Sequence, residues 1–432
     1  MMIKFCVALL LTIAIPCLAQ NPVVPGYFAD PNIREFDGTY YLYGTTDGYT
    51  SVSGEPMVWI STDLVTWKPK SLGVNHMRFF WAPSVIKGKN GKYYMYYTHG
   101  MDYTAYVWVG DTPVGPWKEM GQIGGFDFET FEDPVSGKIY GLSSSKEVFE
   151  FDNNPASPTY LIKVEKKHPF QGKFFDFTEG PYIISRNNLY YLMWAGGRCW
   201  QESYKIQYAT SKSLLGPYTD GENNPLLETN KEKEIYGPGH HSILKHGDKY
   251  LVFYHRQDKN RYPTCNYRFL CVGELTFGEK GTMEKIRPID NLRLELKLPA
   301  SPLVNLSLNR PVATDSETKG FPASFALDDQ NDTRWKAEAG ENKWLSVDLG
   351  SQKKIEQIEI AFEYPDKFTL FKVEYSNDNA NWTTYVDHTK IAKKGYESYL
   401  TQKSAEARYV RLTILRTEEP NASIWELKVW GK

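Results

Sequence analysis

The chain has 432 residues, which is enough for two or three domains, and its 50 basic and 52 acidic residues give a formal net charge of −2. This near-balance excludes a general electrostatic attraction to nucleic acid or to an anionic membrane, so we expect an uncharged partner. Aromatic residues make up 15% of the chain, which suits β-sheet packing and also suits surfaces that stack on flat rings.

Residues 1–19 have the pattern of a secretory signal peptide. Lys4 precedes an apolar run over residues 5–15, and "CLAQ" offers small residues for cleavage after Ala19. No later stretch is long and apolar enough to span a bilayer. We therefore expect a secreted or periplasmic protein. A lipid anchor on Cys17 is the alternative, which Pro16 disfavours.

Three cysteines remain after removal of the signal, namely Cys199, Cys265 and Cys271. An odd number allows at most one disulfide and leaves one thiol over. The protein is therefore not built on a disulfide scaffold.

A pattern of strand, tight turn and Tyr-rich strand recurs along the first two thirds of the chain. It is found in "ADPNIREFDGTYYLYG" (29–44), "WAPSVIKGKNGKYYMYY" (81–97), "FDFETFEDPVSGKIYGL" (126–142), "TEGPYIISRNNLYYLMW" (178–194) and "GHHSILKHGDKYLVFYH" (239–255). The turns favour the positive φ angles of hairpins. Each repeat is long enough for a four-stranded sheet, so we predict a five-bladed β-propeller over residues 20–300.

The repeat stops near residue 300, at the proline-containing stretch "KLPASPLVNLSLNRPVATD". Residues 301–432 carry alternating apolar and polar runs, which predict strands at "KWLSVDLG", "KIEQIEIAF", "TLFKVEYS", "RYVRLTIL" and "IWELKVWG". We expect an all-β chain in which a β-sandwich follows the propeller.

Acidic residues stand at the heads of three of the five repeats. The heads are Asp30, Ala82, Asp127, Glu179 and His240, and a propeller gathers such positions around one axis. Clustered carboxylates raise one another's pKa and are costly unless they have a function. A general acid and a general base are what glycoside hydrolysis requires. Taken singly, each of these residues could equally be a turn or loop residue.

The local context of each head suggests its role. Glu179 follows "FFDFT", an apolar neighbourhood that favours a protonated general acid, and Asp30 in "FADPN" suits the general base. Asp127 would orient the acid. His240 in "GPGHHS" would be an orienting group or a metal ligand through water.

These motifs resemble glycoside hydrolase family 43, whose members are five-bladed propellers that cleave with inversion. "ADPNI" is similar to its general-base motif and "EGPYI" to its general-acid motif. "FDFETF" corresponds to its pKa-modulating aspartate, for which Asp133 is a competitor. The resemblance implies a substrate-contacting arginine at Arg268 and allows a calcium ion near His240. Glycoside hydrolase family 32 retains configuration, and its "NDPNG" and "ECP" motifs are absent.

Aromatic residues near the heads are candidates for the sugar-binding wall. Trp81 and Phe80 in "RFFWAPSV" could stack on a sugar ring or pack within the blade. Trp194, with Arg198 and Trp200 in "WAGGRCW", could line the rim of the pocket.

The C-terminal residues "FALDDQNDTRWKAEAGENKWLSVDLG", "VEYSNDNANW", "ARYVRLTI" and "WELKVWG" resemble the discoidin, or F5/8 type C, jelly roll of family 32 carbohydrate-binding modules. The resemblance implies a structural calcium ion near Asp328, Thr333 and Glu426, although Gln330 replaces an aspartate found in many relatives. The module could bind sugar or serve as a scaffold.

We therefore expect an inverting exo-glycosidase that acts on side chains of plant cell-wall polysaccharides, as a monomer and without a cofactor for its chemistry. The resemblance favours α-L-arabinofuranosidase activity, with β-xylosidase and exo-β-1,3-galactanase as rivals. A non-catalytic sugar-binding propeller, or lectin, is the alternative from another class.

Overall fold

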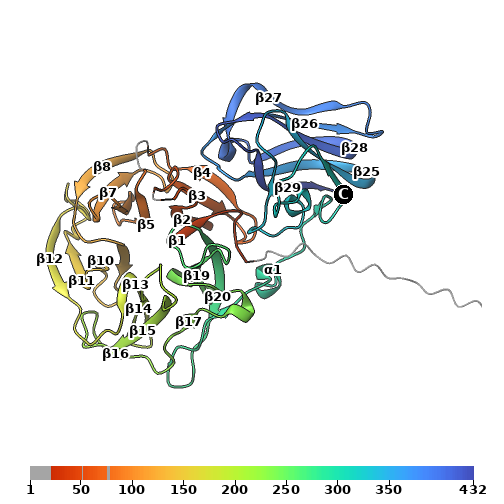
Figure 1. The fold of residues 1–432 in the computed structure, drawn as a ribbon. Coiled ribbons are helices and arrows are strands. Elements are labelled where there is room, and N and C mark those ends of the chain that lie inside the picture. Colours follow the sequence, from red (N-terminus) through yellow and green to blue (C-terminus); the bar gives the residue numbers. More distant parts are fainter. Residues whose placement is uncertain (1–20, 51, 75–77) are drawn as a thin grey trace, which may run out of the picture.

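The structure is a computed structural model that describes residues 21–50, 52–74 and 78–432. The predicted signal peptide and its cleavage site lie outside these residues. The described chain forms five antiparallel sheets around a common axis, followed by a separate β-domain beside the first blade (Figure 1). The predicted fold class, a five-bladed propeller followed by a β-sandwich, is confirmed.

Each blade is built from strands that are consecutive in the chain. Blade one contains β1 (Phe28–Phe36), β2 (Thr39–Thr46), β3 (Met57–Ser61) and β4 (Lys68–Ser71). Blade two contains β5 (Phe80–Lys87), β6 (Tyr93–His99), β7 (Thr104–Gly110) and β8 (Trp117–Gln122). Blade three contains β9 (Glu129–Glu132), β10 (Ile139–Ser143), β11 (Glu147–Phe151) and β12 (Val164–Pro169).

The last two blades follow the same plan. Blade four contains β13 (Phe177–Arg186), β14 (Leu189–Gly196), β15 (Lys205–Ser211) and β16 (Thr219–Asp220), and β17 (Leu227–Glu228) also pairs with β15. The 3₁₀-helix η1 (Lys231–Lys233) precedes blade five, which contains β18 (Gly239–His246), β19 (Lys249–Gln257), β20 (Arg268–Leu275) and β21 (Arg287–Pro288). The short helix α1 (Leu292–Glu295) leads into the second domain.

The residues before blade one close the ring by binding to blade five. The Asn21 side chain donates to the carbonyls of Val272 and Ile289 and accepts from the Val272 amide. Tyr27 forms a β-bridge with Phe269. The start and the end of the propeller are therefore joined by backbone and side-chain hydrogen bonds, which leaves less edge exposed.

The hairpin turns have the backbone that their sequences predict. Asp37 and Gly38 both adopt positive φ (52° and 77°), as do Asn187 and Asn188 (50° and 61°). In the other three hairpins the glycine alone does so, at Gly91, Gly137 and Gly247. Gly, Asn and Asp are the residues that tolerate this region of conformational space.

Each blade has one residue with positive φ at the head of its inner strand, and in blades one, two, four and five the strand pairing also shifts register there. These residues are Asp30 (49°), Ala82 (44°), Asp127 (43°), Gly180 (58°) and His240 (30°). Gly180, and not Glu179, is therefore the equivalent position in blade four, and the predicted repeat register was wrong there by one residue. The prediction aligned acid with acid, whereas the repeated feature is a backbone bend.

The second domain buries one continuous apolar core between its strands. Its strands are β22 (Val304–Asn305), β23 (Val312–Thr314), β24 (Trp335–Lys336), β25 (Lys343–Phe362), β26 (Phe368–Ser376), β27 (Thr383–Lys394), β28 (Leu400–Thr417) and β29 (Ser423–Gly431). The 3₁₀-helices are η2 (Ala323–Ala326) and η3 (Gly395–Glu397). Two strands predicted at 343–350 and 354–362 are halves of β25, which shifts register between them. Strand β27 was not predicted.

The two domains share an apolar and hydrogen-bonded interface. The Trp425 ring lies edge-on to the Tyr27 ring, with centroids 5.2 Å apart, and is buried in one cluster with Phe269. Glu55 of the propeller pairs with Lys394 of the sandwich. Across the described residues, no helix has the length and apolar character needed to cross a membrane.

Candidate active site

Asp30 lies at the head of β1 with its carboxylate fully engaged by partners. Arg268, the first residue of β20, donates to both oxygens, from Nη1 to Oδ1 at 2.6 Å and from Nη2 to Oδ2 at 3.1 Å. The Thr45 hydroxyl donates to Oδ2 at 2.7 Å, and His255 Nδ1 lies 3.2 Å from Oδ1. The bulge at Asp30 turns its side chain toward these neighbours from blades one and five.

The environment of Asp30 keeps it ionised. Burial by itself disfavours the charged form, but the charges of Arg268 and His240 and the hydrogen bond from His255 outweigh it, and the pKa of Asp30 falls well below its usual range. A carboxylate that stays unprotonated at neutral pH is the form that a general base requires.

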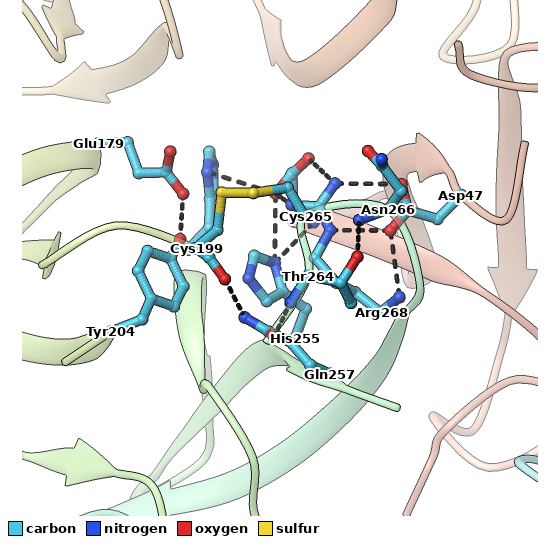
Figure 2. Close-up of a disulfide and its surroundings, with 12 residues drawn as sticks. Asp47, Glu179, Cys199, Tyr204, His255, Gln257, Thr264, Cys265, Asn266 and Arg268 are labelled. Atoms are coloured by element: carbon cyan, nitrogen blue, oxygen red, sulfur yellow. Dashed lines mark hydrogen bonds and ion pairs between the residues drawn. A yellow bond between two sulfur atoms is a disulfide. The ribbon is translucent and has the colours of Figure 1, made fainter. Parts of the chain in front are cut away.

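Asp47 is a site residue that sequence reasoning missed. It holds Arg268 from the other side, accepting from Nε at 2.8 Å, from Nη2 at 3.1 Å and from the backbone amide at 3.2 Å. Arg268 thus pairs with two buried carboxylates, of which Asp47 is labelled in Figure 2. Burial raises the pKa of Asp47 to about 6, against the attraction of Arg268. A buried arginine requires a buried acidic partner, and this requirement could have suggested such a residue. The sequence does not show which aspartate is the partner.

The surroundings of Arg268 add to the predicted role. The resemblance implied that Arg268 contacts substrate, which stays a prediction, and the structure shows its guanidinium buried and bound to Asp30 and Asp47. Its direct role in this structure is to fix the charge and orientation of Asp30.

Asp127 occupies the equivalent head of blade three. Its amide donates to Thr98 Oγ1 at 2.7 Å. Burial, followed by the charges of Glu179 and Asp30, raises the pKa of Asp127 well above its usual range. Asp127 therefore lies close enough to Glu179 and to Asp30 for the charge of each to disfavour its ionised form. Asp133, the competitor, instead accepts from Ser136 and Tyr190 at the hairpin turn of the blade.

Glu179 stands directly before the bulge of blade four and accepts a hydrogen bond from the Tyr204 hydroxyl (Figure 2). The phenylalanines that precede it do not form the expected apolar pocket. Phe175 is 65% exposed, and Phe177 stacks on Trp194 inside the blade. The neighbour that holds Glu179 is a polar group from the loop after β14.

Three histidines lie near the axis at blade five. His240 Nδ1 is 3.6 Å from Asp30 Oδ1. Burial lowers the pKa of His255 to about 4 and that of His241 to about 3, so both rings are neutral at pH 7. Within the part of the chain that the structure describes, the ring nitrogens of His241 and Nε2 of His255 are buried without a hydrogen-bond partner, which suits ordered water at the axis.

The structure corrects two of the predicted sugar-contacting residues. Phe80 is 1% exposed and stacks on Tyr97 with ring centroids 4.6 Å apart. Trp194 is also 1% exposed and packs against Phe177. Both side chains point into blade cores, because alternation along a strand sends every second residue inward.

Other aromatic residues from the same segments remain accessible. Trp81 is partly exposed and lies edge-on to Tyr103, which is 64% exposed, with ring centroids 5.8 Å apart. Trp200 is 55% exposed, and the Arg198 guanidinium lies over its ring. Of the aromatic and arginine residues predicted from the sequence, Trp81, Arg198 and Trp200 are therefore the ones that a ligand could reach.

The cysteines form one disulfide and leave one thiol over, as their number allows. Cys199 and Cys265 form a disulfide, and Cys271 is free and buried. The disulfide joins the loop after β14 to the loop before β20, both beside the acidic site (Figure 2).

The predicted calcium residues of the sandwich lie in one region. Thr333 Oγ1 donates to Asp328. Among the described residues, neither Glu426 carboxylate oxygen has a hydrogen-bond partner, and both are buried. Burial raises the pKa of Glu426 well above its usual range against the attraction of Lys428, and Asp329 and Asp328 add to the rise. Unpaired carboxylate oxygens fit a hard cation. Within residues 21–50, 52–74 and 78–432, no group of three or more His, Cys, Asp or Glu side chains is arranged to hold a metal ion.

The acidic site has the parts of an acid–base hydrolytic centre. Asp30 is an ionised carboxylate held by an arginine, and Glu179 is hydrogen-bonded to a tyrosine. Asp127 is a third carboxyl group, and its pKa is raised. Such pairs of carboxyl groups, kept in different protonation states by their surroundings, are the means by which glycosidases cleave acetals.

Comparison with known proteins agrees with this chemistry. Residues 311–427 match the model of the F5/8 type C domain. A "Beta-D-galactofuranosidase" of Aspergillus niger is 29% identical over 302 residues, which cover 64% of this chain and 86% of that protein. A "Non-reducing end alpha-L-arabinofuranosidase" of Bacteroides ovatus is 28% identical over 48% of this chain and 41% of its own length.

Solved structures extend the likeness to both domains. A structure titled "Glycoside hydrolase" matches with a TM-score of 0.79 and 26% identity over 95% of this chain and 99% of that one. The model of the "Glycosyl hydrolases family 43" matches residues 19–283, which is more than half of the chain and includes all three carboxylates. The protein is therefore a glycoside hydrolase and belongs to family 43.

Proposed function

We propose that the enzyme is an inverting exo-glycosidase that releases terminal α-L-arabinofuranosyl units from side chains of plant cell-wall polysaccharides. The observation that carries the proposal is the gathering of Asp30, Asp127 and Glu179 at the blade heads, in three different electrostatic surroundings. An uncharged polysaccharide also suits the balanced charge of the chain.

In this mechanism each acid has one task. Asp30, kept ionised by Arg268, takes a proton from a water molecule as that water attacks the anomeric carbon. Glu179 gives its proton to the departing glycosidic oxygen as the carbon–oxygen bond breaks. Asp127, with its raised pKa, adjusts the charge around Glu179. Attack from the face opposite the leaving group inverts the anomeric configuration.

A galactofuranoside is the second candidate substrate. It is favoured by the activity for which the Aspergillus niger relative is named, since this chain covers 86% of that protein. Both candidates present a five-membered ring at a non-reducing end. β-Xylosidase and exo-β-1,3-galactanase activities are further alternatives within the family.

Export and calcium binding complete the proposal. The signal-like N-terminus and the Cys199–Cys265 disulfide support an oxidising compartment outside the cytoplasm. We propose structural calcium at Asp328, Thr333 and Glu426, which the carboxylate oxygens of Glu426 support because they lack a hydrogen-bond partner among the described residues, and the resemblance to family 43 allows a second ion near His240. The expected monomer is checked by light scattering.

The test is a release assay on p-nitrophenyl α-L-arabinofuranoside, β-D-galactofuranoside, β-D-xyloside and β-D-galactoside. We expect turnover of a furanoside, and a loss of roughly 100-fold or more in kcat for Asp30→Asn and for Glu179→Gln on an unactivated substrate. Proton NMR of the first product should show the inverted anomer. Normal turnover by both variants would overturn the proposal, and a wild-type protein that releases no sugar from any of the four glycosides would favour the lectin alternative.

A further inference from the structure

We propose that Tyr204 is a positioning residue for Glu179, and that the Cys199–Cys265 disulfide holds the loop of Tyr204 in register with the strand that carries Arg268. The inference rests on the proposed function, because it takes Glu179 as the general acid. It assigns a role to a tyrosine and to a disulfide that are not among the three carboxylates of the reaction.

Tyr204 connects the two sides of the site. Its hydroxyl donates to Glu179 Oε1. Its ring is fully buried and lies parallel to the His255 ring, with centroids 5.8 Å apart and an interplanar angle of 4°. His255 Nδ1 in turn lies 3.2 Å from Asp30 Oδ1. The rings of Tyr204 and His255 therefore lie between Glu179 and Asp30 and help to set the distance between these two carboxyl groups.

The space for the ring is provided by a glycine. A Cβ atom on Gly239, in β18, would lie 2.0 Å from Cε1 of Tyr204. Only glycine permits this approach of strand and ring. Burial and the charge of Glu179 raise the pKa of Tyr204 well above its usual range, so the phenol stays a donor at every working pH.

The loop that presents Tyr204 is tied at two points. Cys199 is disulfide-bonded to Cys265, which lies three residues before Arg268. Beneath the disulfide, Gln257 donates to the Cys199 carbonyl at 2.7 Å and accepts from the Thr264 amide at 2.6 Å (Figure 2). The loop that carries Tyr204 and the loop that precedes Arg268 are thus joined by the disulfide and by the side-chain amide of Gln257.

This connection matters because catalytic geometry tolerates little movement. A displacement of about 1 Å can cost on the order of 100-fold in rate. The loop between β14 and β15 carries the exposed Trp200, so it has no large apolar anchor at that point. The disulfide fixes this loop to a neighbouring loop. It thereby supplies the rigidity that Tyr204 needs in order to hold Glu179 in place.

The dependence of the rate loss on the leaving group shows whether Tyr204 positions Glu179 or only stabilises the fold. A 2,4-dinitrophenyl glycoside departs as a stable phenolate and needs no proton from Glu179. A methyl glycoside or an oligosaccharide departs as an alkoxide and requires that proton as the bond breaks. Loss of acid positioning therefore slows the second kind of substrate selectively, whereas a smaller folded fraction slows both equally.

The experiment compares Tyr204→Phe with Tyr191→Phe in the full-length enzyme. Tyr191 is an equally buried tyrosine of blade four whose hydroxyl donates to the Gly281 carbonyl at 2.7 Å, away from the carboxylates. We expect Tyr204→Phe to lower kcat/KM roughly tenfold or more on the oligosaccharide and less than about threefold on the dinitrophenyl furanoside. Tyr191→Phe should leave the ratio of the two rates unchanged.

The disulfide is tested with Cys199→Ser/Cys265→Ser, for which we expect the same selective loss in a smaller degree. Equal rate losses on both substrates in Tyr204→Phe would overturn the role of the tyrosine. An unchanged rate ratio in the double serine variant would overturn that of the disulfide. Glu179→Gln separates these outcomes from the function itself: if it lacks the selective loss, then the assignment of the acid fails instead.

Discussion

A single arginine held between two aspartates sets the electrostatics of the site at the level of residues. Arg268 pairs with Asp30 on one side and with Asp47 on the other, and all three side chains are buried. Removing one partner of a buried ion pair leaves the other with less compensation. Asp47 therefore affects the reaction through Arg268, without touching the reacting atoms.

Asp47→Asn should lower kcat roughly tenfold with little change in KM, because the guanidinium loses the carboxylate that orients it on Asp30. Steady-state kinetics on p-nitrophenyl furanosides measures this. Asp133→Asn is the matched control, since Asp133 is also buried but accepts its hydrogen bonds at a hairpin turn. An unaltered kcat in Asp47→Asn would contradict the orienting role.

Stability should depend on the protonation of His241. Because its pKa is lowered to about 3 in the folded protein, the unfolded chain binds more protons below about pH 6.5, and folding is weakened as the pH falls. His241→Phe removes this contribution. Relative to the wild type, the variant should gain roughly 1.4 kcal/mol in unfolding free energy per pH unit from about 6.5 toward 4. Urea unfolding at pH 7, 6, 5 and 4 checks the difference, and parallel curves would disprove it.

The backbone bend at each blade head is the element that positions the chemistry. It gives positive φ to Asp30, Asp127 and His240, and to Gly180 in blade four. Non-glycine residues in this region carry strain of order 1 kcal/mol or more, which folded proteins tolerate at functional sites. Blade four takes the bend on Gly180 and carries its acid, Glu179, one residue earlier.

Gly180→Ala should destabilise the enzyme and disturb its site. A Cβ atom there would lie 3.0 Å from the His240 ring, at a φ of +58°. Gly91→Ala is the control, because Gly91 has a φ of +81° with nothing within 4 Å. Both variants should lose roughly 1 kcal/mol from backbone strain. Only Gly180→Ala should also lose activity, measured beside its melting temperature. Equal activities would show that crowding at His240 is without effect.

The packing of the sandwich against the propeller decides how the whole molecule unfolds. Trp425, Tyr27 and Phe269 bury a shared apolar cluster at the interface, and Arg256 of blade five pairs with Asp332 of the sandwich at 2.5 Å. An interface with its own apolar core couples the stabilities of the two domains. We expect a single thermal transition for the intact protein.

Trp425→Ala should separate that transition into two, because it leaves a cavity between the domains and costs roughly 3–5 kcal/mol. Differential scanning calorimetry resolves the outcome. Trp335→Ala serves as the comparison, since Trp335 is buried in the sandwich core itself. It should destabilise the sandwich without uncoupling it. One unsplit transition in Trp425→Ala would show that the domains are held together elsewhere.

The sequence alone determined the architecture and predicted the three acids. The pattern of turn residues and alternating strands recurs within short segments, so it can be read from the sequence. Turn residues also adopt their preferred backbone conformation whatever surrounds them, as at Asp37–Gly38 and Asn187–Asn188. The family motifs at Asp30 and Glu179 were equally readable, because each is a short contiguous run.

Tertiary structure alone decided which side chains meet. Asp47 and Arg268 are 221 residues apart, and Tyr204 reaches Glu179 only through the folding of a loop, so no local pattern predicts either pair. The direction of Phe80 and Trp194, into the core and away from a sugar, depended on strand register, where a shift of one residue reverses the face. Local chemistry was present in the sequence, whereas the partners that set charge and orientation arise only when distant strands come together around one axis.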